Sequence, residues 1–150
     1  MRPSKEEYYL NIAKAVSKRS PCLRRHYGCI IVKDDEIIAT GYNGSPRGGI
    51  NCCDRGICHR KNLAHNTGDY SECCSVHAEQ NAMLSASRSE MIGATMYLYG
   101  EEYQEEHLSV IDIHVNAWYK IDAVPCPICS RMIKNSGIIK VVNGSGEVCL

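Results

Sequence analysis

The sequence predicts a single α/β domain, in which a central mixed sheet of about four to five strands lies between helices on both faces, giving three α/β/α layers. Two observations support this fold class. Apolar runs of strand length alternate along the chain with segments of helical periodicity. The chain has 150 residues, of which 44% are hydrophobic and 23% charged, so it buries a core without needing disulfide bonds. We therefore treat residues 1–150 as one domain.

The composition argues against several classes of protein. Seventeen basic and seventeen acidic residues give a formal net charge of zero, which argues against long nucleic acid as a partner. The N-terminus lacks the apolar segment of a signal peptide, and no apolar run approaches the roughly 18 residues of a membrane span. We expect a cytoplasmic protein without membrane contact. In a reducing compartment its ten cysteines indicate metal ligands or buried thiols rather than disulfides.

The first forty residues predict a helix followed by a β-hairpin. Residues 4–20 have apolar side chains at helical spacing, namely Tyr8, Ile12, Ala15 and Val16. We expect this face of the helix to pack on the core. Pro21 ends the helix, and two apolar runs, 28–32 and 36–40, flank a polar turn. That pattern is typical of two antiparallel strands.

The middle of the chain contains two segments without helix or strand periodicity. Residues 41–49 include four glycines, which is typical of a loop with unusual backbone angles or of one that lies close to a ligand. Residues 50–75 include five cysteines. A loop of this length in a compact domain needs something other than a core to order it, and a metal ion is our candidate.

The second half of the chain predicts two more helices and two more strands. The helices are expected over 77–87 and 126–135, and the strands over 94–99 and 138–142. Residues 101–122 form a polar insertion with room for a strand at 111–115. The tail, residues 144–150, is expected to be a short edge strand or disordered.

Three residues in this half supply ligands suited to zinc. His77 opens one predicted helix, and Cys126 and Cys129 open another. Three protein ligands leave one corner of a tetrahedral zinc open for water, as in catalytic sites. In the middle of a helix, His77 and Glu79 would project about 200° apart, whereas at a first turn both side chains reach the same site. The positive ends of the two helices favour thiolate over thiol.

Glu79 supplies a carboxylate that need not be a ligand. A water bound to zinc has its pKa lowered toward roughly 7, and we predict that Glu79 takes its proton and returns it to the substrate. Alone, a His-Ala-Glu triplet is common at a helix start, and a Cys-x-x-Cys pair also fits a redox site or half of a structural metal site. Together they form the His-x-Glu and Pro-Cys-x-x-Cys signature of zinc deaminases that act on cytosine or adenine.

The chain also contains the segments CLRRHYGCIIV, GYNGSPRGG followed by NCCD, VHAEQNAM and PCPICSRMIKNSGI. In these segments it resembles the deoxycytidylate (dCMP) deaminases of the cytidine deaminase superfamily. The resemblance implies a cytidine deaminase-like fold and hydrolytic deamination of dCMP to dUMP with release of ammonia, which supplies dUMP for thymidylate synthesis. It implies that Glu79 is the proton shuttle and that the zinc ligands are His77, Cys126 and Cys129.

Substrate contacts follow from the same resemblance. Asn43 matches a loop asparagine that contacts the sugar and base of the substrate. The amide of Ala78 would lie beside the base carbonyl, and Arg24 or Arg25 would meet the 5′-phosphate. Two alternatives stay open: a different substrate, such as dCTP, free cytidine or an adenine in RNA, and a zinc-ordered nucleotide-sensing module without turnover.

Regulation and assembly are implied as well. Many members of the family are hexamers, switched on by dCTP and off by dTTP, so we expect a homo-oligomer here. The site for these effectors includes the GYNG region, which gives a second interpretation to Gly41, Tyr42, Asn43 and Gly44. Mg²⁺ would accompany a triphosphate effector.

Some relatives hold a second, structural zinc, and four thiolates would close its tetrahedron. In this chain the corresponding residues are Cys22, Cys52, Cys58 and Cys73, with Cys53, Cys74 and His65 as possible substitutes. The insertion at 101–122 is longer than in the simplest relatives, and the chain stops soon after the last predicted strand.

Overall fold

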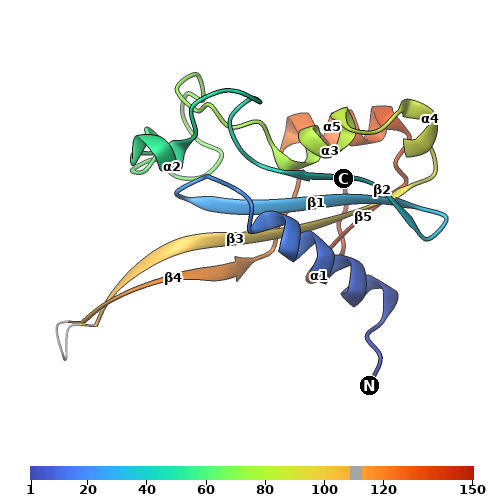
Figure 1. The fold of residues 1–150 in the computed structure, drawn as a ribbon, viewed down its shortest axis with the longest axis horizontal. Helices are drawn as coiled ribbons and strands as arrows, with labels where there is room; N and C mark the ends of the chain where they lie inside the picture. Colours follow the sequence, from blue (N-terminus) through green and yellow to red (C-terminus); the bar gives the residue numbers. More distant parts are fainter. Residues whose placement is uncertain (109–112) are drawn as a thin grey trace.

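The computed structural model describes residues 1–108 and 113–150, and it confirms the three-layer α/β/α arrangement (Figure 1). The strands are β1 (Arg25–Lys33), β2 (Glu36–Tyr42), β3 (Thr95–Leu108), β4 (Ile113–Ile121), β5 (Lys140–Asn143) and β6 (Gly146–Glu147). They form one six-stranded sheet in the order β2-β1-β3-β5-β6, with β4 paired to β3 outside this path. The sheet is mixed, because β3 and β5 are parallel and the other pairs are antiparallel. The two-residue β6 and the insertion strand β4 raise the number above the expected four to five.

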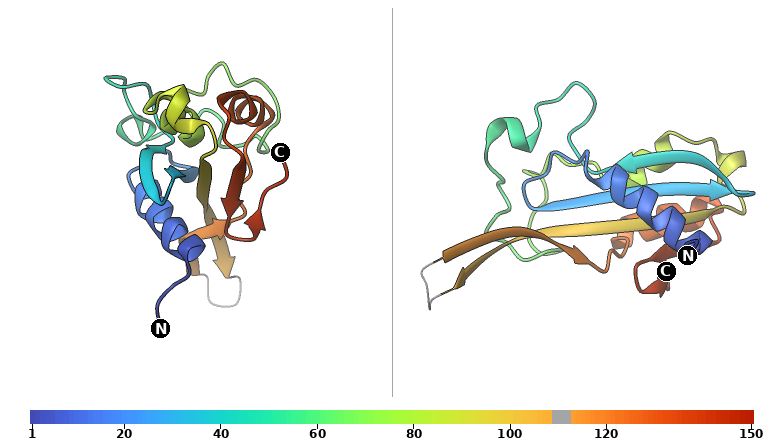
Figure 2. Two further views of the ribbon diagram at one scale, coloured as in Figure 1. Left: turned by 90° about the vertical axis from the view of Figure 1, so that its right-hand side faces the viewer. Right: turned by 60° about the horizontal axis from the view of Figure 1, so that its bottom comes forward.

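The helices lie on both faces of this sheet. They are α1 (Lys5–Ser17), α2 (Cys52–Arg55), α3 (Ala78–Leu84), α4 (Arg88–Met91) and α5 (Pro127–Ser136). Figures 1 and 2 show α1 on one face of the sheet, and α3, α4 and α5 on the opposite face. None of the described helices is both long and apolar enough to cross a membrane.

The interior strand β1 supplies side chains to both halves of the core. Cys29 and Ile31 pack with the helices α3 and α5, whereas Ile30 and Val32 pack with α1. All four are buried, as expected when successive side chains of a central strand point to opposite covered faces. β1 therefore ties the two layers of helices together, and its N-terminal end leads to the site described below.

The predicted core-facing side of α1 was right for Ile12 and Val16, which pack against the core, and wrong for Tyr8 and Ala15, which are exposed. The helix buries Tyr9, Ala13 and Ser17, whereas Tyr8 is 48% exposed. The cause is Gly28 on β1, where a Cβ atom would lie 2.0 Å from the carbonyl oxygen of Ala13. The helix backbone rests directly on this glycine, so the small residues Ala13 and Ser17 face the sheet at this point.

The insertion is a long β-hairpin. β3 continues well past its predicted end at residue 99 and pairs with β4 from Gly100 opposite Ile121 to Leu108 opposite Ile113. Both figures show the hairpin extending beyond the rest of the sheet. Of the strand predicted at 111–115, residues 111 and 112 lie outside the described residues, and the others begin β4. At the base of the hairpin, the rings of His26 and Trp118 stack with centroids 3.6 Å apart.

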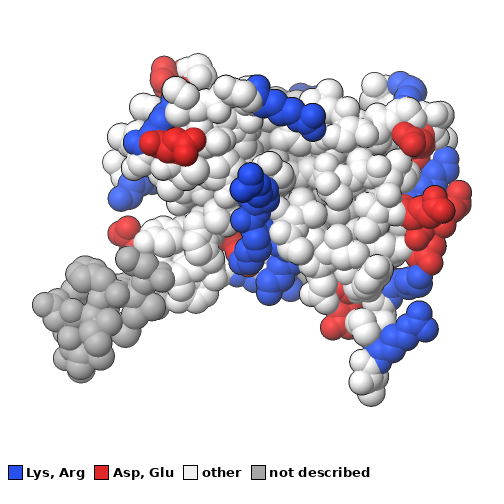
Figure 3. Space-filling view, viewed as in Figure 1, with Lys and Arg blue, Asp and Glu red and all other residues white. Residues whose placement is uncertain are grey.

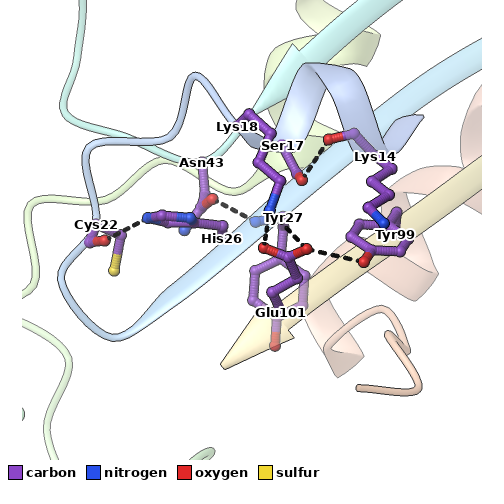
Figure 4. A network of polar contacts seen from close by, with 9 residues as sticks. All are labelled: Lys14, Ser17, Lys18, Cys22, His26, Tyr27, Asn43, Tyr99 and Glu101. Carbon is purple, nitrogen blue, oxygen red and sulfur yellow. Dashed lines mark hydrogen bonds and ion pairs between the residues drawn. The ribbon is translucent and has the colours of Figure 1, made fainter. Parts of the chain in front are cut away.

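A buried carboxylate joins α1 to the start of this hairpin. Glu101 is 4% exposed, and its Oε1 atom accepts hydrogen bonds from Lys18 Nζ at 2.7 Å and from the Tyr99 hydroxyl at 2.9 Å. Figure 4 shows Lys18 and Tyr99 converging on Glu101 from α1 and from β3. Because a buried charge is costly unless it is paired, these partners fix the end of α1 over the sheet.

The cysteine-rich segment and the tail complete the chain. Residues 50–75 contain only the one-turn helix α2 among turns and loops, which agrees with their lack of periodicity. The tail forms β6, which pairs with β5 in the antiparallel sense. Of the two outcomes expected for the tail, the short edge strand is confirmed.

Candidate active site

Three predicted zinc ligands converge at one point of the fold. His77 Nδ1 lies 3.6 Å from Cys126 Sγ and 3.5 Å from Cys129 Sγ. The ligand atoms of all three residues lie within 4.8 Å of one another. Among the residues that the structure describes, no other group of three His, Cys, Asp or Glu side chains is this compact.

The convergence arises from two helix starts. His77 is the N-cap of α3 and has an extended backbone, with φ −71° and ψ 154°. Cys126 is the N-cap of α5, and its Sγ atom accepts a hydrogen bond from the Cys129 amide at 3.4 Å. An N-cap residue lies outside the helical spiral, so His77 and Glu79 escape the angular separation that they would have in mid-helix.

The donor set fits zinc. Two sulfur atoms and an imidazole nitrogen are the ligands that zinc prefers, and three of them leave a fourth position free. Burial lowers the pKa of His77, which keeps its imidazole neutral and able to bind a metal. Burial, followed by the nearby Glu79 and Cys126, raises the pKa of the Cys129 thiol. A bound cation would offset the charge of the Cys129 thiolate.

Glu79 lies in the first turn of α3 and is 5% exposed. Burial raises its pKa to about 7. Glu79 lines the same cavity as His77 and Cys126. A carboxyl group with such a pKa is able to accept and to release a proton near neutral pH, which is the requirement for general acid–base catalysis.

The cavity above this point also brings together residues from the N-terminal half. Arg24, Arg25, Tyr27 and Asn43 contribute to its wall, and His65 from the cysteine-rich segment does so too. Its polar lining combines cationic side chains with one buried carboxyl group. Such a cavity suits a small anionic ligand with hydrogen-bonding groups.

Asn43 is held firmly in this wall. It is 5% exposed, its Oδ1 atom accepts a hydrogen bond from the Tyr27 amide at 2.8 Å, and its Nδ2 donates to the Arg25 carbonyl at 2.9 Å. Figure 4 shows the contact between Asn43 and Tyr27. The Asn43 side chain thus fixes the start of β1 beside the cavity.

The other residues of the GYNG segment lie elsewhere. Gly41 lies under α3, where a Cβ atom would come within 2.3 Å of the carbonyl oxygen of Ala78, which is itself fully buried. Tyr42 and Gly44 line a second cavity. Asn43 thus lines the first cavity, whereas Tyr42 and Gly44 line the second.

The two candidate arginines differ in what they contact. Arg25 donates from Nε to Glu102 at 2.8 Å and from Nη1 to the Tyr27 hydroxyl at 3.0 Å. Arg24 donates from Nη1 to the carbonyl oxygen of Arg60 at 2.7 Å. Arg25 is thus neutralised by a carboxylate, whereas the contact of Arg24 is with a neutral group.

The four cysteines predicted to bind a second metal do not all line the same cavity. Cys22, Cys58 and Cys73 line the first cavity. Burial raises the pKa of the Cys22 thiol. Cys52 instead lies with its Sγ atom 3.6 Å from that of Cys74. Within the described chain, these sulfur atoms do not form a group as compact as that around His77.

Some residues of the cavity were not predicted as parts of the site. Tyr27 was accessible to sequence reasoning, because alternation along β1 places it on the same face as Cys29, under α3. Arg60 and Tyr70 line the cavity as well. They come from the stretch without periodicity, where no pattern in the sequence indicates which side chains turn inward.

Comparison with known proteins agrees with this geometry. The family model of the cytidine and deoxycytidylate deaminase zinc-binding region matches residues 3–145. The chain is 38% identical over 142 residues to a deoxycytidylate deaminase of Schizosaccharomyces pombe, covering 94% of this chain and 37% of that protein. It is 37% identical over 147 residues to a deoxycytidylate deaminase of Mycobacterium phage D29, covering 94% of each chain. The chain thus spans little more than a third of the fission yeast protein and nearly all of the phage protein.

A solved structure shares the fold. The crystal structure of dCMP deaminase from the cyanophage S-TIM5 in complex with dCMP and dUMP superposes with a TM-score of 0.62 at 29% sequence identity, covering 95% of this chain and 82% of that one. This match confirms the cytidine deaminase-like fold, and the family model covers both helix starts that carry the candidate zinc ligands. The chain belongs to the family of the cytidine and deoxycytidylate deaminases.

Proposed function

We propose that the protein is a zinc-dependent hydrolase that deaminates dCMP to dUMP and releases ammonia. The observation that carries this proposal is the placement of His77, Cys126 and Cys129 around one point, with the buried carboxyl group of Glu79 in the same cavity. The relatives named deoxycytidylate deaminase and the cyanophage complex with dCMP and dUMP support this substrate.

The residues take separate roles in the reaction. His77, Cys126 and Cys129 would hold zinc. When bound, zinc would act as a Lewis acid that makes water nucleophilic at neutral pH. Glu79 accepts a proton from the water that attacks C4 of cytosine and delivers it to N3. It then transfers the second proton of that water to the departing amino group, which leaves as ammonia. Burial of Glu79 favours this shuttle because it brings the carboxyl pKa to about 7.

Substrate binding would use the opposite wall of the cavity. Arg24 is the better candidate for the 5′-phosphate, because its contact is with a carbonyl oxygen whereas Arg25 is paired with Glu102. Asn43 would contact the sugar and base from its fixed position beside β1, and the amide of Ala78 would meet the base carbonyl. A phosphate contact at Arg24 favours a nucleotide over free cytidine.

The direct test is ammonia release by the purified protein from dCMP, deoxycytidine, cytidine and dCTP, with the zinc content measured in parallel. The proposal expects dCMP to be the preferred substrate. A protein that binds zinc and nucleotide but releases no ammonia from any of them would instead be a nucleotide-sensing module.

Regulation by dCTP and dTTP is a further part of the proposal, and the second cavity supports it. Lys18, Arg19 and Arg47 line this cavity beside Tyr42 and Gly44. Figure 3 shows basic side chains gathered over the C-terminal end of α1. Lys18 and Arg19 directly follow this helix in the chain. Arg19 and Arg47 suit a triphosphate, whereas Lys18 is paired with Glu101. Mg²⁺ would accompany the triphosphate. Loss of the response to dCTP in Arg47→Ala, with unchanged basal turnover, is the expected result.

Three more properties belong to the same proposal. A second, structural zinc would use Cys22, Cys58 and Cys73 with Cys52 or Cys74, and a zinc content near two per chain would support it. A homo-oligomer such as a hexamer is testable by sedimentation, and the extended β3–β4 hairpin offers strand edges for assembly. A cytoplasmic location agrees with the use of cysteine thiols as metal ligands.

A further inference from the structure

One stretch of the cysteine-rich segment is organised around a single side chain. We call residues 60–70 the Arg60 loop. The loop contains no helix or strand, and two of its larger apolar side chains, Leu63 and Tyr70, are 42% and 39% exposed. Apolar burial therefore does not explain how it is ordered.

The side chain of Arg60 occupies the centre of this loop. Arg60 is 4% exposed. Its guanidinium donates hydrogen bonds to the carbonyl oxygens of Thr67 and Asp69, and its Cζ atom lies 3.4 Å from the centroid of the Tyr70 ring. The planar guanidinium thus binds two carbonyl groups with its edge while it stacks on an aromatic ring with its face, a combination that lysine cannot reproduce.

Further hydrogen bonds depend on this arrangement. The Tyr70 hydroxyl, placed by the stacking on Arg60, accepts a hydrogen bond from the Asn66 amide at 2.8 Å. The Thr67 hydroxyl donates to the Ala64 carbonyl at 2.6 Å. Loss of the guanidinium would release Thr67, Asp69 and Tyr70 together, and Asn66 with them.

The Arg60 loop forms part of the cavity that contains Glu79. His65, Asn66 and Tyr70 line this cavity along with Arg60 itself. The loop is also joined to the opposite wall, because the Arg60 carbonyl accepts the hydrogen bond from Arg24 Nη1 at 2.7 Å. The same carbonyl accepts from the Leu63 amide at 3.1 Å. One residue thus orders the loop through its side chain and holds Arg24 through its backbone.

We propose that Arg60 is a positioning residue for the nucleotide: it fixes the Arg60 loop as one wall of the substrate cavity and orients Arg24 toward the 5′-phosphate. This inference rests on the proposed function. It assigns the order of residues 60–70 to a guanidinium, whereas the sequence had suggested a metal ion for the whole segment. The proposal predicts a defect in nucleotide binding without a defect in zinc binding.

The test compares Arg60→Lys with Arg55→Lys. Both changes keep the positive charge and lie in the same segment, but Arg55 is exposed on α2. For each variant we would measure hydrogen exchange over residues 60–70 and the zinc content. We would also measure the affinity for dUMP by titration calorimetry, and KM and kcat for dCMP and for deoxycytidine. A third variant, Tyr70→Leu, removes the stacking ring and leaves Arg60 in place.

In Arg60→Lys we expect the rate of hydrogen exchange in the loop to rise at least tenfold. The Kd for dUMP and the KM for dCMP should each rise about tenfold, whereas kcat and zinc content should stay within about twofold of the wild-type values. KM for deoxycytidine should change less than KM for dCMP, since Arg24 acts on the phosphate. Tyr70→Leu should show the same pattern more weakly, and Arg55→Lys should match the wild type.

Several results would overturn the inference. One is an Arg60→Lys protein with wild-type exchange and wild-type affinity, since another agent such as a metal would then order the loop. A second is faster exchange without weaker binding, because the loop would then not position the nucleotide. A third is a wild type that does not bind dUMP. If the wild type binds dUMP but releases no ammonia, the proposed function fails, and the affinities still decide the role of Arg60.

Discussion

His77 Nδ1 and Cys129 Sγ lie 3.5 Å apart although 52 positions separate them in the chain. The first precedes α3 and the second lies in the first turn of α5, so the contact depends on how these two helices pack on the sheet. A metal at this point would connect two elements that the polypeptide chain does not connect locally.

Metal removal should therefore affect stability as well as activity. Chelation, or the change Cys129→Ser, is expected to abolish both zinc binding at this site and deamination. The free energy of unfolding should fall by about 3 kcal/mol, which is the stabilisation given by a ligand present at roughly a hundredfold its Kd. The matched control is Cys149→Ser, because Cys149 is exposed near the C-terminus. Thermal unfolding and metal analysis check this, and an unchanged Tm in the zinc-free protein would contradict it.

Loss of Arg24 and loss of Arg25 should have different effects. Arg24→Ala is expected to raise KM for dCMP by about tenfold or more, since a charge-assisted contact to phosphate is worth about 1.5 kcal/mol or more, and to leave deoxycytidine unaffected. Arg25→Ala should instead lower stability, because it leaves Glu102 without its ion pair at 2.7 Å. Arg88→Ala, on an exposed position of α4, is the control. Equal effects of Arg24→Ala on both substrates would exclude a phosphate contact.

The buried Glu101 predicts a dependence of stability on pH. Burial is the largest influence and raises its pKa, but hydrogen bonds from Lys18 and Tyr99, with the charge of Lys18, outweigh it, so the net pKa lies below 4.5. A carboxyl whose pKa is lower in the folded protein stabilises the fold above its unfolded pKa and loses this contribution as pH falls through the folded value.

Glu101→Gln should thus lower the free energy of unfolding by about 1–3 kcal/mol at pH 7, and the difference from the wild type should shrink below about pH 4.5. Urea unfolding at pH 7 and at pH 4 measures this, with Glu72→Gln at an exposed position as the control. A difference that is the same at both pH values would show that the ionised form of Glu101 is not the stabilising species.

Packing of α1 on the sheet gives a prediction that is independent of the metal. Gly28→Ala places a Cβ atom 2.0 Å from the Ala13 carbonyl oxygen and 2.5 Å from the Ser17 amide nitrogen. Because both are backbone atoms, α1 must move, and we expect a loss of about 1–3 kcal/mol, as for overpacked cores. Asn11→Ala, on the exposed side of α1, should have little effect. Urea unfolding of the two variants checks this, and a Gly28→Ala protein as stable as the wild type would contradict the close contact.

Sequence reasoning found the zinc ligands because their arrangement is local. The His77-Ala78-Glu79 triplet and the Cys126 to Cys129 spacing each lie within one turn at a helix start, so their relative geometry follows from backbone rules alone. The fully buried positions of α1, Tyr9, Ala13 and Ser17, could not be found in this way. They are set by a glycine on a different element, and apolar spacing within the helix carries no information about Gly28.

The length of the hairpin and the order of the Arg60 loop escaped prediction for related reasons. The part of β3 beyond residue 99 is mostly polar and is held by backbone pairing with β4, so no apolar pattern marks it as a strand. The strand expected at 111–115 covers only the start of β4. The Arg60 loop depends on hydrogen bonds from one side chain to carbonyl groups, which every residue carries. The sequence therefore indicated that something other than a core orders residues 50–75, but not which side chain does so in this loop.

The central claim is that Glu79 moves the protons of a zinc-dependent deamination. The most direct measurement is ammonia release from dCMP by Glu79→Gln, with the zinc content of the same preparation determined. Glutamine keeps the shape of the side chain and cannot accept the proton, so kcat should fall about 10²- to 10⁴-fold while zinc and nucleotide binding persist. A Glu79→Gln protein that retains zinc and deaminates dCMP at the wild-type rate would contradict the account.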